Sequence, residues 1–80
     1  MLVPLYGFLR GDTIGLVVLV HDHQSIAEVA ATLQEAAAVR VAPRPHADVF
    51  VDGRKLDPRQ TVHSAGLRPL TRIDVVPRDA

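Results

Sequence analysis

Three residues whose side chains could bind a metal ion stand next to one another at His21, Asp22 and His23. Imidazole and carboxylate groups suit several transition metals. Alternate side chains of a strand point to opposite faces, however, which would set Asp22 apart from the two histidines. The sequence places no third ligand nearby, so we expect a polar loop here rather than a metal site.

Nucleophilic and nucleotide-binding sites are not indicated either. Ser64 follows His63, but adjacent residues rarely face each other and no orienting acid is placed with them. The glycines are dispersed and form no phosphate-cradling loop. His46 is isolated, and we expect ordinary surface positions for it and for His63. The sequence therefore predicts no catalytic residue, no cofactor-binding residue and no metal ligand in this chain.

Length and composition limit the classes of protein that remain. The chain has 80 residues, which is enough for one domain, 1–80, with a small core. Its nine basic and nine acidic residues cancel, which favours neither a nucleic acid nor an anionic membrane as a partner. Cysteine is absent, and no segment resembles a membrane span or an export signal. We expect a cytoplasmic protein.

The elements that would carry any binding surface begin with a hairpin. Apolar runs at 2–9 and 14–20 flank a turn at Arg10, Gly11 and Asp12. Both runs are apolar at successive positions, so we expect both faces of the sheet to be apolar. The side chains expected to face the core are Val3, Leu5, Ile14, Leu16 and Val18. Those expected to face away are Tyr6, Phe8, Val17 and Leu19.

A helix should follow the hairpin. Ser25 and Glu28 have the spacing of a capping box, and Pro43 and Pro45 rule out a continuation beyond an end near Val39. Its buried stripe is expected to contain Ile26, Val29, Ala30, Leu33 and Ala37. The other face carries alanines among polar residues: Ala27, Ala31 and Ala38 with Glu28, Thr32, Gln34 and Glu35. This face reflects either helix propensity or a protein contact.

The second half of the chain predicts a further hairpin and a final strand. Asp52-Gly53 is a strong turn signal between strands at 49–51 and 54–56. Residues 61–65 should form one helical turn that stops at Gly66, and Pro69 should keep the chain extended into a strand at 72–76. With the first and last strands parallel, the sequence predicts an α+β fold, a β-grasp with a mixed four- to five-stranded sheet packed on one α-helix.

Two segments resemble ubiquitin. Residues 49–56 are similar to its third strand, its Gly-containing turn and the short strand that follows, and residues 73–76 are similar to its last strand. The resemblance implies a ubiquitin-like fold. Sulfur carriers and modifiers of this kind need a terminal glycine, whereas this sequence has Ala80 at its end with no Gly-Gly before it. We therefore do not expect a carrier or modifier role.

Three stretches resemble the small ubiquitin-like subunit of toluene monooxygenases, also called system protein B or the hydroxylase gamma subunit. They are Arg40-Val41-Ala42-Pro43-Arg44, then Leu56 with Pro58 and Arg59, and finally Ser64, Gly66, Leu67 and Pro69 leading into 73–76. The resemblance implies a non-catalytic assembly subunit of a multicomponent diiron aromatic hydroxylase, an oxidoreductase complex of aromatic hydrocarbon catabolism. It also implies large and medium hydroxylase subunits as partners, and a diiron centre in the large one, so that this chain binds no cofactor.

Two groups of residues are candidates for the protein interface. Phe50 matches the apolar residue at the centre of ubiquitin's recognition patch, and Val76 should share its face with the outward residues of the first hairpin, Tyr6, Phe8, Val17 and Leu19. Arg40 and Arg44 belong to the one basic concentration, which is either an interface or a solvated rim. A β-grasp adaptor of another complex remains the alternative function, and self-association remains open.

Overall fold

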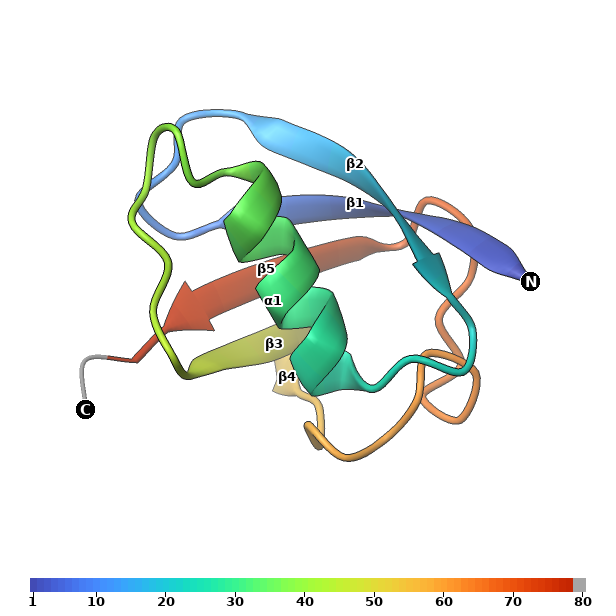
Figure 1. Cartoon of the computed structure of the whole chain (residues 1–80). Helices are drawn as coiled ribbons and strands as arrows, with labels where there is room; N and C mark the ends of the chain where they lie inside the picture. Colours follow the sequence, from blue (N-terminus) through green and yellow to red (C-terminus); the bar gives the residue numbers. More distant parts are fainter. Residues whose placement is uncertain (79–80) are drawn as a thin grey trace.

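The computed structural model describes residues 1–78, which form one α-helix packed on one mixed sheet. The elements are β1 (Leu2–Leu9), β2 (Gly15–His21), α1 (Ile26–Ala36), β3 (Ala47–Val51), β4 (Arg54–Lys55) and β5 (Arg72–Pro77). The strand order is β2-β1-β5-β3-β4, and α1 crosses one face of the sheet (Figure 1). This is the β-grasp arrangement, so the expected α+β fold is confirmed, with five strands in the described part of the chain.

The two central strands come from opposite ends of the chain. β1 and β5 pair in parallel, with Tyr6 opposite Arg72 and Leu9 opposite Val75. The neighbouring pairs, β1 with β2 and β3 with β5, are antiparallel. A parallel pair cannot be joined by a tight turn and needs a crossover. Here the crossover contains α1, which therefore lies over the sheet and covers its inner face.

The core lies between α1 and this inner face. The predicted helical stripe is confirmed, because all five of its residues are buried. The prediction that Ile14 of the first hairpin faces the core is wrong. Ile14 is 48% exposed, whereas Val20 at the other end of β2 is buried. The physical reason is that β2 begins at Gly15, so Ile14 belongs to the preceding turn and does not follow the alternation of the strand.

Gly7 allows the helix to lie close to the sheet. A Cβ atom built at Gly7 would stand 2.8 Å from both terminal methyl carbons of Leu33 in α1. Real Cβ atoms do not approach other carbons so closely, because repulsion rises steeply inside van der Waals contact. The hydrogen atom of glycine therefore leaves room for the Leu33 side chain of α1 against β1 at this point.

The start of α1 agrees with the prediction, and its end does not. Ser25 Oγ accepts the Glu28 N–H at 3.1 Å, and the Ser25 N–H donates to Glu28 Oε1 at 2.9 Å, so the capping box is present. The helix ends at Ala36 rather than near Val39. Beyond Ala37 the chain has no buried residue to continue the stripe, and it turns with the Arg40 N–H donating to the Ala37 carbonyl.

The turns of the second half are mostly as predicted. Asp52 and Gly53 both have positive φ, 52° and 77°, as a tight hairpin turn requires, and Gly66 stops the 61–65 turn at φ 72°. The expectation that Pro69 extends the chain is wrong. Leu70 has φ 62°, and the Thr71 N–H donates to the Arg68 carbonyl, because proline followed by a residue with positive φ forms a reverse turn.

One ion pair ties the β1–β2 turn to the chain that follows α1. Arg40 Nε and Nη2 donate to the two carboxylate oxygens of Asp12 at 2.8 and 2.9 Å. The Asp12 side chain is only 1% exposed, and it also accepts the Thr13 N–H. The hydrogen bonds from Arg40 hold the pKa of Asp12 below its ordinary value of 3.8.

This pair should make stability depend on pH. Because the pKa of Asp12 is lowered in the folded state, its contribution is complete above the unfolded-state pKa of about 3.9 and is lost as pH falls through the folded-state value. We expect Arg40→Gln to be less stable than the unaltered chain at pH 7, with a difference that shrinks below about pH 4. Urea unfolding over a pH series measures this.

Arg59→Gln is the matched control for this prediction. Arg59 is 89% exposed on its side chain and pairs with Asp57 at 3.4 Å, so its replacement should change stability much less. A difference between Arg40→Gln and the unaltered chain that stays constant from pH 7 into the acid range would contradict the role assigned to Asp12.

Candidate protein interface

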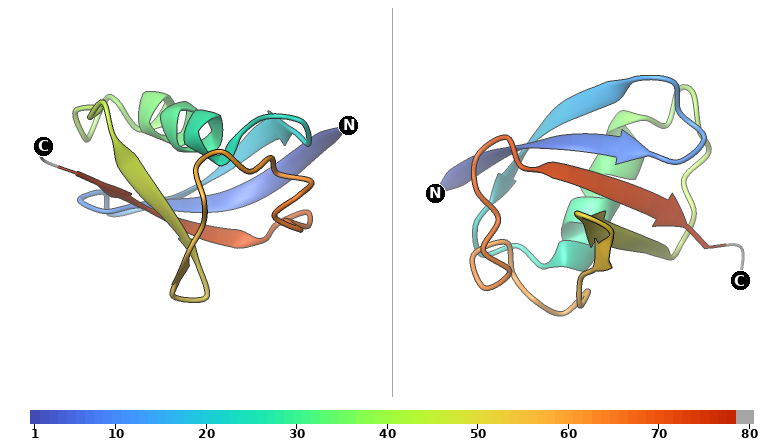
Figure 2. Two further views of the ribbon diagram at one scale, coloured as in Figure 1. Left: turned by 90° about the horizontal axis from the view of Figure 1, so that it is seen from below. Right: turned by 180° about the vertical axis from the view of Figure 1, so that it is seen from behind.

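The face of the sheet that α1 does not cover carries a group of apolar side chains on β1 and β2. Tyr6 lies opposite Val17 in the β1–β2 register, and Leu19 lies opposite Pro4. The residues Tyr6, Val17 and Leu19 are 40%, 59% and 62% exposed. Together with Phe8 these residues form what we call the outer patch, and the right-hand view of Figure 2 looks onto this face. The structure thus brings together four predicted interface residues.

Tyr6 and Phe8 form an aromatic pair within the outer patch. Their ring centroids are 4.7 Å apart with planes tilted by 58°, a geometry that aromatic pairs prefer. The rings extend over Gly15 of the edge strand β2, where an added Cβ would lie 2.8 Å from ring carbons of both residues. This glycine was not predicted as part of the site. Its position opposite Phe8 in the hairpin register was the available signal.

Charged residues of β5 separate the outer patch from Phe50. Asp74 lies opposite Phe8 on one side and opposite Phe50 on the other. Arg72 pairs with Asp74 at 3.2 Å, and its guanidinium stands 4.1 Å from the centroid of the Phe8 ring, a cation–π contact. These two charged residues were not among the predicted interface residues. The apolar side chains share one face without forming a continuous apolar area.

Val76 lies at the border of the outer patch. It lines a shallow depression together with Phe8, Arg10 and Asp74. Phe50 and Val76 are both half-buried, unlike the outer patch residues of β2. A partner that covers this whole face would therefore meet apolar side chains on β1 and β2 and a mixed polar surface on β5 and β3.

The two predicted basic interface residues lie away from the outer patch, in the chain that follows α1. Arg40 holds Asp12, as described above. The backbone of Arg44 is held by Gln34, whose amide donates to the Arg44 carbonyl at 3.1 Å and accepts the Arg44 N–H at 2.8 Å. Gln34 was expected on the exposed face and is instead 4% exposed. Its spacing of four residues from Ala30 was the missed signal.

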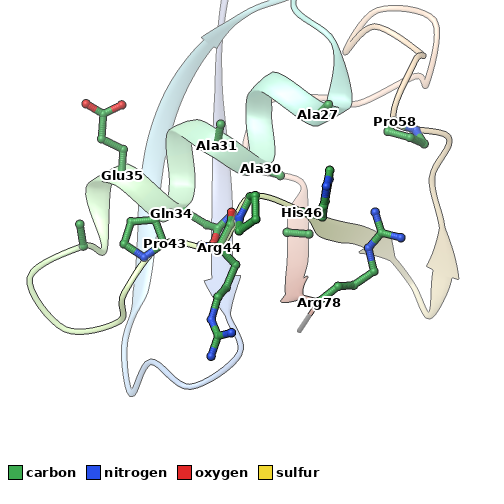
Figure 3. A pocket seen from close by; sticks show the side chains of 13 residues that line it. Ala27, Ala30, Ala31, Gln34, Glu35, Pro43, Arg44, His46, Pro58 and Arg78 are labelled. Carbon is green, nitrogen blue, oxygen red and sulfur yellow. The ribbon is translucent and has the colours of Figure 1, made fainter. Parts of the chain in front are cut away.

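The loop that Gln34 holds forms one side of an open groove. The alanine face of α1, with Ala27 and Ala31, lies opposite Pro43 and Pro45 of the loop, and the space between them has a volume of about 460 Å³. Figure 3 shows these residues together with Arg44, His46 and Arg78. The alanines that sequence reasoning left open between helix propensity and a contact face therefore line a concave surface.

The candidate metal residues do not form a cluster in the structure. Asp22 Oδ1 accepts a hydrogen bond from the amino group of Met1 at 3.3 Å, and this bond lowers the pKa of Asp22. The rings of His21 and His23 have centroids 5.1 Å apart. Among residues 1–78 no group of three or more histidine, aspartate or glutamate side chains is arranged to hold a metal ion. In the same range no helix is long and apolar enough to cross a membrane.

Fold and surface together define a ubiquitin-like β-grasp protein with an exposed apolar sheet face. Residues 2–76 match the model of the toluene-4-monooxygenase system protein B family, and the chain belongs to this family. The family resemblance and the accessory role in a toluene-monooxygenase-type system are thereby confirmed. No curated protein gives a significant match to the sequence.

Several solved structures are similar over nearly the whole chain. A chain of the toluene 4-monooxygenase HD complex with the inhibitor 4-bromobenzoate matches with a TM-score of 0.88 and 26% identity, covering 98% of this chain and 100% of that one. The ubiquitin of Caldiarchaeum subterraneum matches with 0.77 and 16%, covering 100% and 98%. A designed protein based on ubiquitin matches with 0.78 and 23%, covering 99% and 92%. The last two show the fold alone.

The expectation against a carrier or modifier role depended on Ala80. That residue lies outside the described residues 1–78, so the structure does not bear on it.

The aromatic pair should depend on Gly15. We expect Gly15→Ala to displace the Tyr6 and Phe8 rings, since the new methyl group would overlap with both. Ring proton chemical shifts of Tyr6 measure this directly. Gly53→Ala is a control, because open space surrounds Gly53 although its φ is positive; it should strain the turn and leave the rings in place. Unchanged ring shifts in Gly15→Ala would show that the pair does not rest on β2.

Gln34 should hold the loop at Arg44. Gln34→Leu removes both hydrogen bonds to the Arg44 backbone, and we expect a stability loss of about 1 kcal/mol together with faster amide exchange at Arg44. Urea unfolding and hydrogen exchange by NMR test this. The neighbouring Glu35 is exposed, so Glu35→Leu should change neither quantity by a comparable amount. Equal exchange rates at Arg44 in the two variants would contradict the assignment.

Proposed function

We propose that this chain is a non-catalytic assembly subunit of a multicomponent diiron hydroxylase that acts on aromatic hydrocarbons in the cytoplasm. The observation that carries the proposal is the match to a whole chain of the toluene 4-monooxygenase complex, at 26% identity over 98% of this chain. The proposed partners are the large and medium hydroxylase subunits. In this proposal the diiron centre belongs to the large subunit, and the present chain supplies surface rather than reacting groups.

The outer patch is the proposed centre of the contact. Removing exposed apolar side chains from water favours association, and aromatic residues at the centre of an interface commonly contribute most. Tyr6, Phe8, Val17 and Leu19 supply this surface, and Phe50 and Val76 extend it across β5. The Arg72–Asp74 pair between them would fix orientation rather than add much affinity.

The two arginines of the loop belong to the rim in this proposal. Arg44 is exposed, and arginine is common at protein interfaces. Arg40 is engaged with Asp12, so its effect on assembly would come through the position of the loop.

Co-expression with the large and medium hydroxylase subunits tests the assignment. We expect the chain to co-purify with them and Val17→Glu to weaken the complex by about tenfold or more, because a charge would be buried in the contact. Val39→Glu is the matched control, since Val39 is 87% exposed and lies just beyond α1, away from the outer patch. Size-exclusion chromatography and titration of the purified subunits measure the difference.

Two results would contradict the proposal. One is a chain that elutes independently while the hydroxylase assembles without it, which would favour an adaptor of another complex. The other is equal binding by Val17→Glu and Val39→Glu, which would place the contact elsewhere on the chain. Thermal unfolding checks that both variants remain folded, in particular that the exposed position 17 on an edge strand tolerates glutamate.

A further inference from the structure

Strand β2 forms one edge of the sheet in the described part of the chain (Figure 1). Its seven residues, Gly15–His21, include no lysine, arginine, aspartate, glutamate or proline. Exposed edge strands commonly carry such residues or are very short, because both features prevent pairing between molecules. The opposite edge follows this rule, since β4 consists of only Arg54 and Lys55. The β2 edge has neither protection and is open to a further strand.

Hydrogen bonds at the end of β2 show which of its backbone groups point outward. The Asp22 N–H donates to the Met1 carbonyl at 3.0 Å, so the backbone of Asp22 points toward the β1 side. Backbone groups alternate along an antiparallel strand, so those of His21 point away. Accordingly, the His21 N–H donates to Gln24 Oε1 at 2.7 Å, and its carbonyl accepts the Gln24 N–H at 3.0 Å. The same alternation turns the N–H and C=O of three further residues away from β1: Gly15, Val17 and Leu19.

The outward groups of these three residues have no partner within residues 1–78. No strand lies beside them, and no loop or side chain of the described chain is hydrogen-bonded to them. An extended chain can supply the missing partners by adding as a strand, whereas a helix satisfies its own backbone groups. The edge therefore selects a strand as its occupant.

β2 is complementary to itself in one antiparallel register. With Val17 opposite Val17 of a second copy, Leu19 of each copy lies opposite Gly15 of the other. All three outward-pointing residues then form hydrogen-bonded pairs, and the pairing stops at His21, whose backbone Gln24 already holds. A shift of two residues in either direction would leave one of these three pairs unformed.

The side chains fit in the same register. Leu19 is a large apolar residue that is 62% exposed. Gly15, which it would face on the second copy, has no side chain and is covered by the Tyr6 and Phe8 rings, to which an added Cβ would come within 2.8 Å. Residues directly opposite each other on neighbouring strands are in contact range. Leu19 of each copy would therefore pack beside the aromatic pair of the other copy, and the two outer patches would adjoin.

We propose that two copies of this chain associate through antiparallel pairing of their β2 strands, about a two-fold axis at Val17. A second copy is the occupant because it presents an uncharged strand with the same three unpaired positions, in a register that places Leu19 against Gly15. The nine basic and nine acidic residues of each copy leave no net repulsion between the two. The pairing uses the edge of the sheet rather than its face, so it goes beyond the proposed assembly role and does not rest on it.

Self-association of the full-length chain alone is the first test. One strand from each copy is a small contact, so we expect a weak dimer with a dissociation constant of about 100 μM. Sedimentation equilibrium over roughly 10 μM to 1 mM measures it. In the ¹⁵N-labelled chain, amide exchange at Val17 and Leu19 should slow as concentration rises. Exchange at Val18, which lies opposite Leu5 of β1, should change less.

Disulfide formation tests the register. The chain contains no cysteine, so a single introduced thiol can bridge only two copies. In the proposed register the two Cα atoms at position 17 are about 5.5 Å apart, which a disulfide can span. Those at position 19 are displaced by four residues, about 13 Å, which it cannot. Under mild oxidation we expect Val17→Cys to crosslink about tenfold faster than Leu19→Cys, the matched control on the same strand and face.

A proline variant tests the backbone pairing. Val17→Pro removes an N–H that points away from β1, and edge strands accept proline at such positions. Val17→Ala is the matched control, because it also loses the valine side chain but keeps the N–H. We expect Val17→Pro to associate about tenfold more weakly than Val17→Ala. Thermal unfolding verifies that both remain folded, and the crosslinking comparison decides if Val17→Pro does not fold.

Each contrary outcome overturns the proposal. A chain that stays monomeric up to about 1 mM leaves the β2 edge to a strand of a different protein. Equal crosslinking of Val17→Cys and Leu19→Cys contradicts the register, and equal association of Val17→Pro and Val17→Ala contradicts the backbone pairing. Ring shifts of Tyr6 that depend on concentration, with unchanged exchange at Val17, would place the contact on the face of the sheet. All these measurements use the chain without hydroxylase subunits, so the two proposals fail separately.

Discussion

The parallel pairing of β1 with β5 is the constraint on which the rest of the structure depends. It joins the first and last strands at the centre of the sheet, with Tyr6 opposite Arg72 and Leu9 opposite Val75. Every other element takes its place from this pairing: α1 covers the inner face of the two strands, β2 extends one edge and β3 the other. Contacts between distant parts of a chain form at the cost of loop-closure entropy. Local interactions, such as the Ser25 cap, reduce the number of conformations that the chain must search before the two strands pair.

Because this pairing is between distant parts of the chain, the sequence predicts the individual elements better than the contacts between them. The capping box, the apolar helical stripe and the Asp52-Gly53 turn are local signals, and each predicted its element correctly. The order of these elements then predicted the β-grasp, and the resemblance to ubiquitin agreed with it. Two errors concern burial: Ile14 belongs to the turn before β2 and is exposed, and Gln34 is buried because it holds the backbone of a loop that follows the helix. The first error lies at a strand boundary, which alternation does not fix, and in the second the helical spacing of Gln34 from Ala30 does not name the loop that covers it.

The candidate interface shows the same limit. Alternation along β1 and β2 correctly assigned Tyr6, Phe8, Val17 and Leu19 to one face. Alternation does not say which strands are neighbours, however, and the insertion of β5 between β1 and β3 puts Asp74 between Phe8 and Phe50. The groove beside α1 could not be found in this way at all, because its walls come from a helix and a loop without a shared pattern. Its alanines were visible in the sequence, but their opposite wall was not.

The close approach at Gly7 has a consequence for how this chain can change over time. The hydrogen of Gly7 and the two methyl groups of Leu33 share the space between β1 and α1. The volume available to one residue therefore depends on the volume of the other. Elsewhere the fold tolerates wide divergence, as the 16% identity to an archaeal ubiquitin demonstrates. At this point a larger residue on the strand requires either a shift of the Leu33 side chain or a smaller residue at position 33. What is acceptable at position 7 is therefore set by the side chain at position 33, a residue 26 positions away in the sequence.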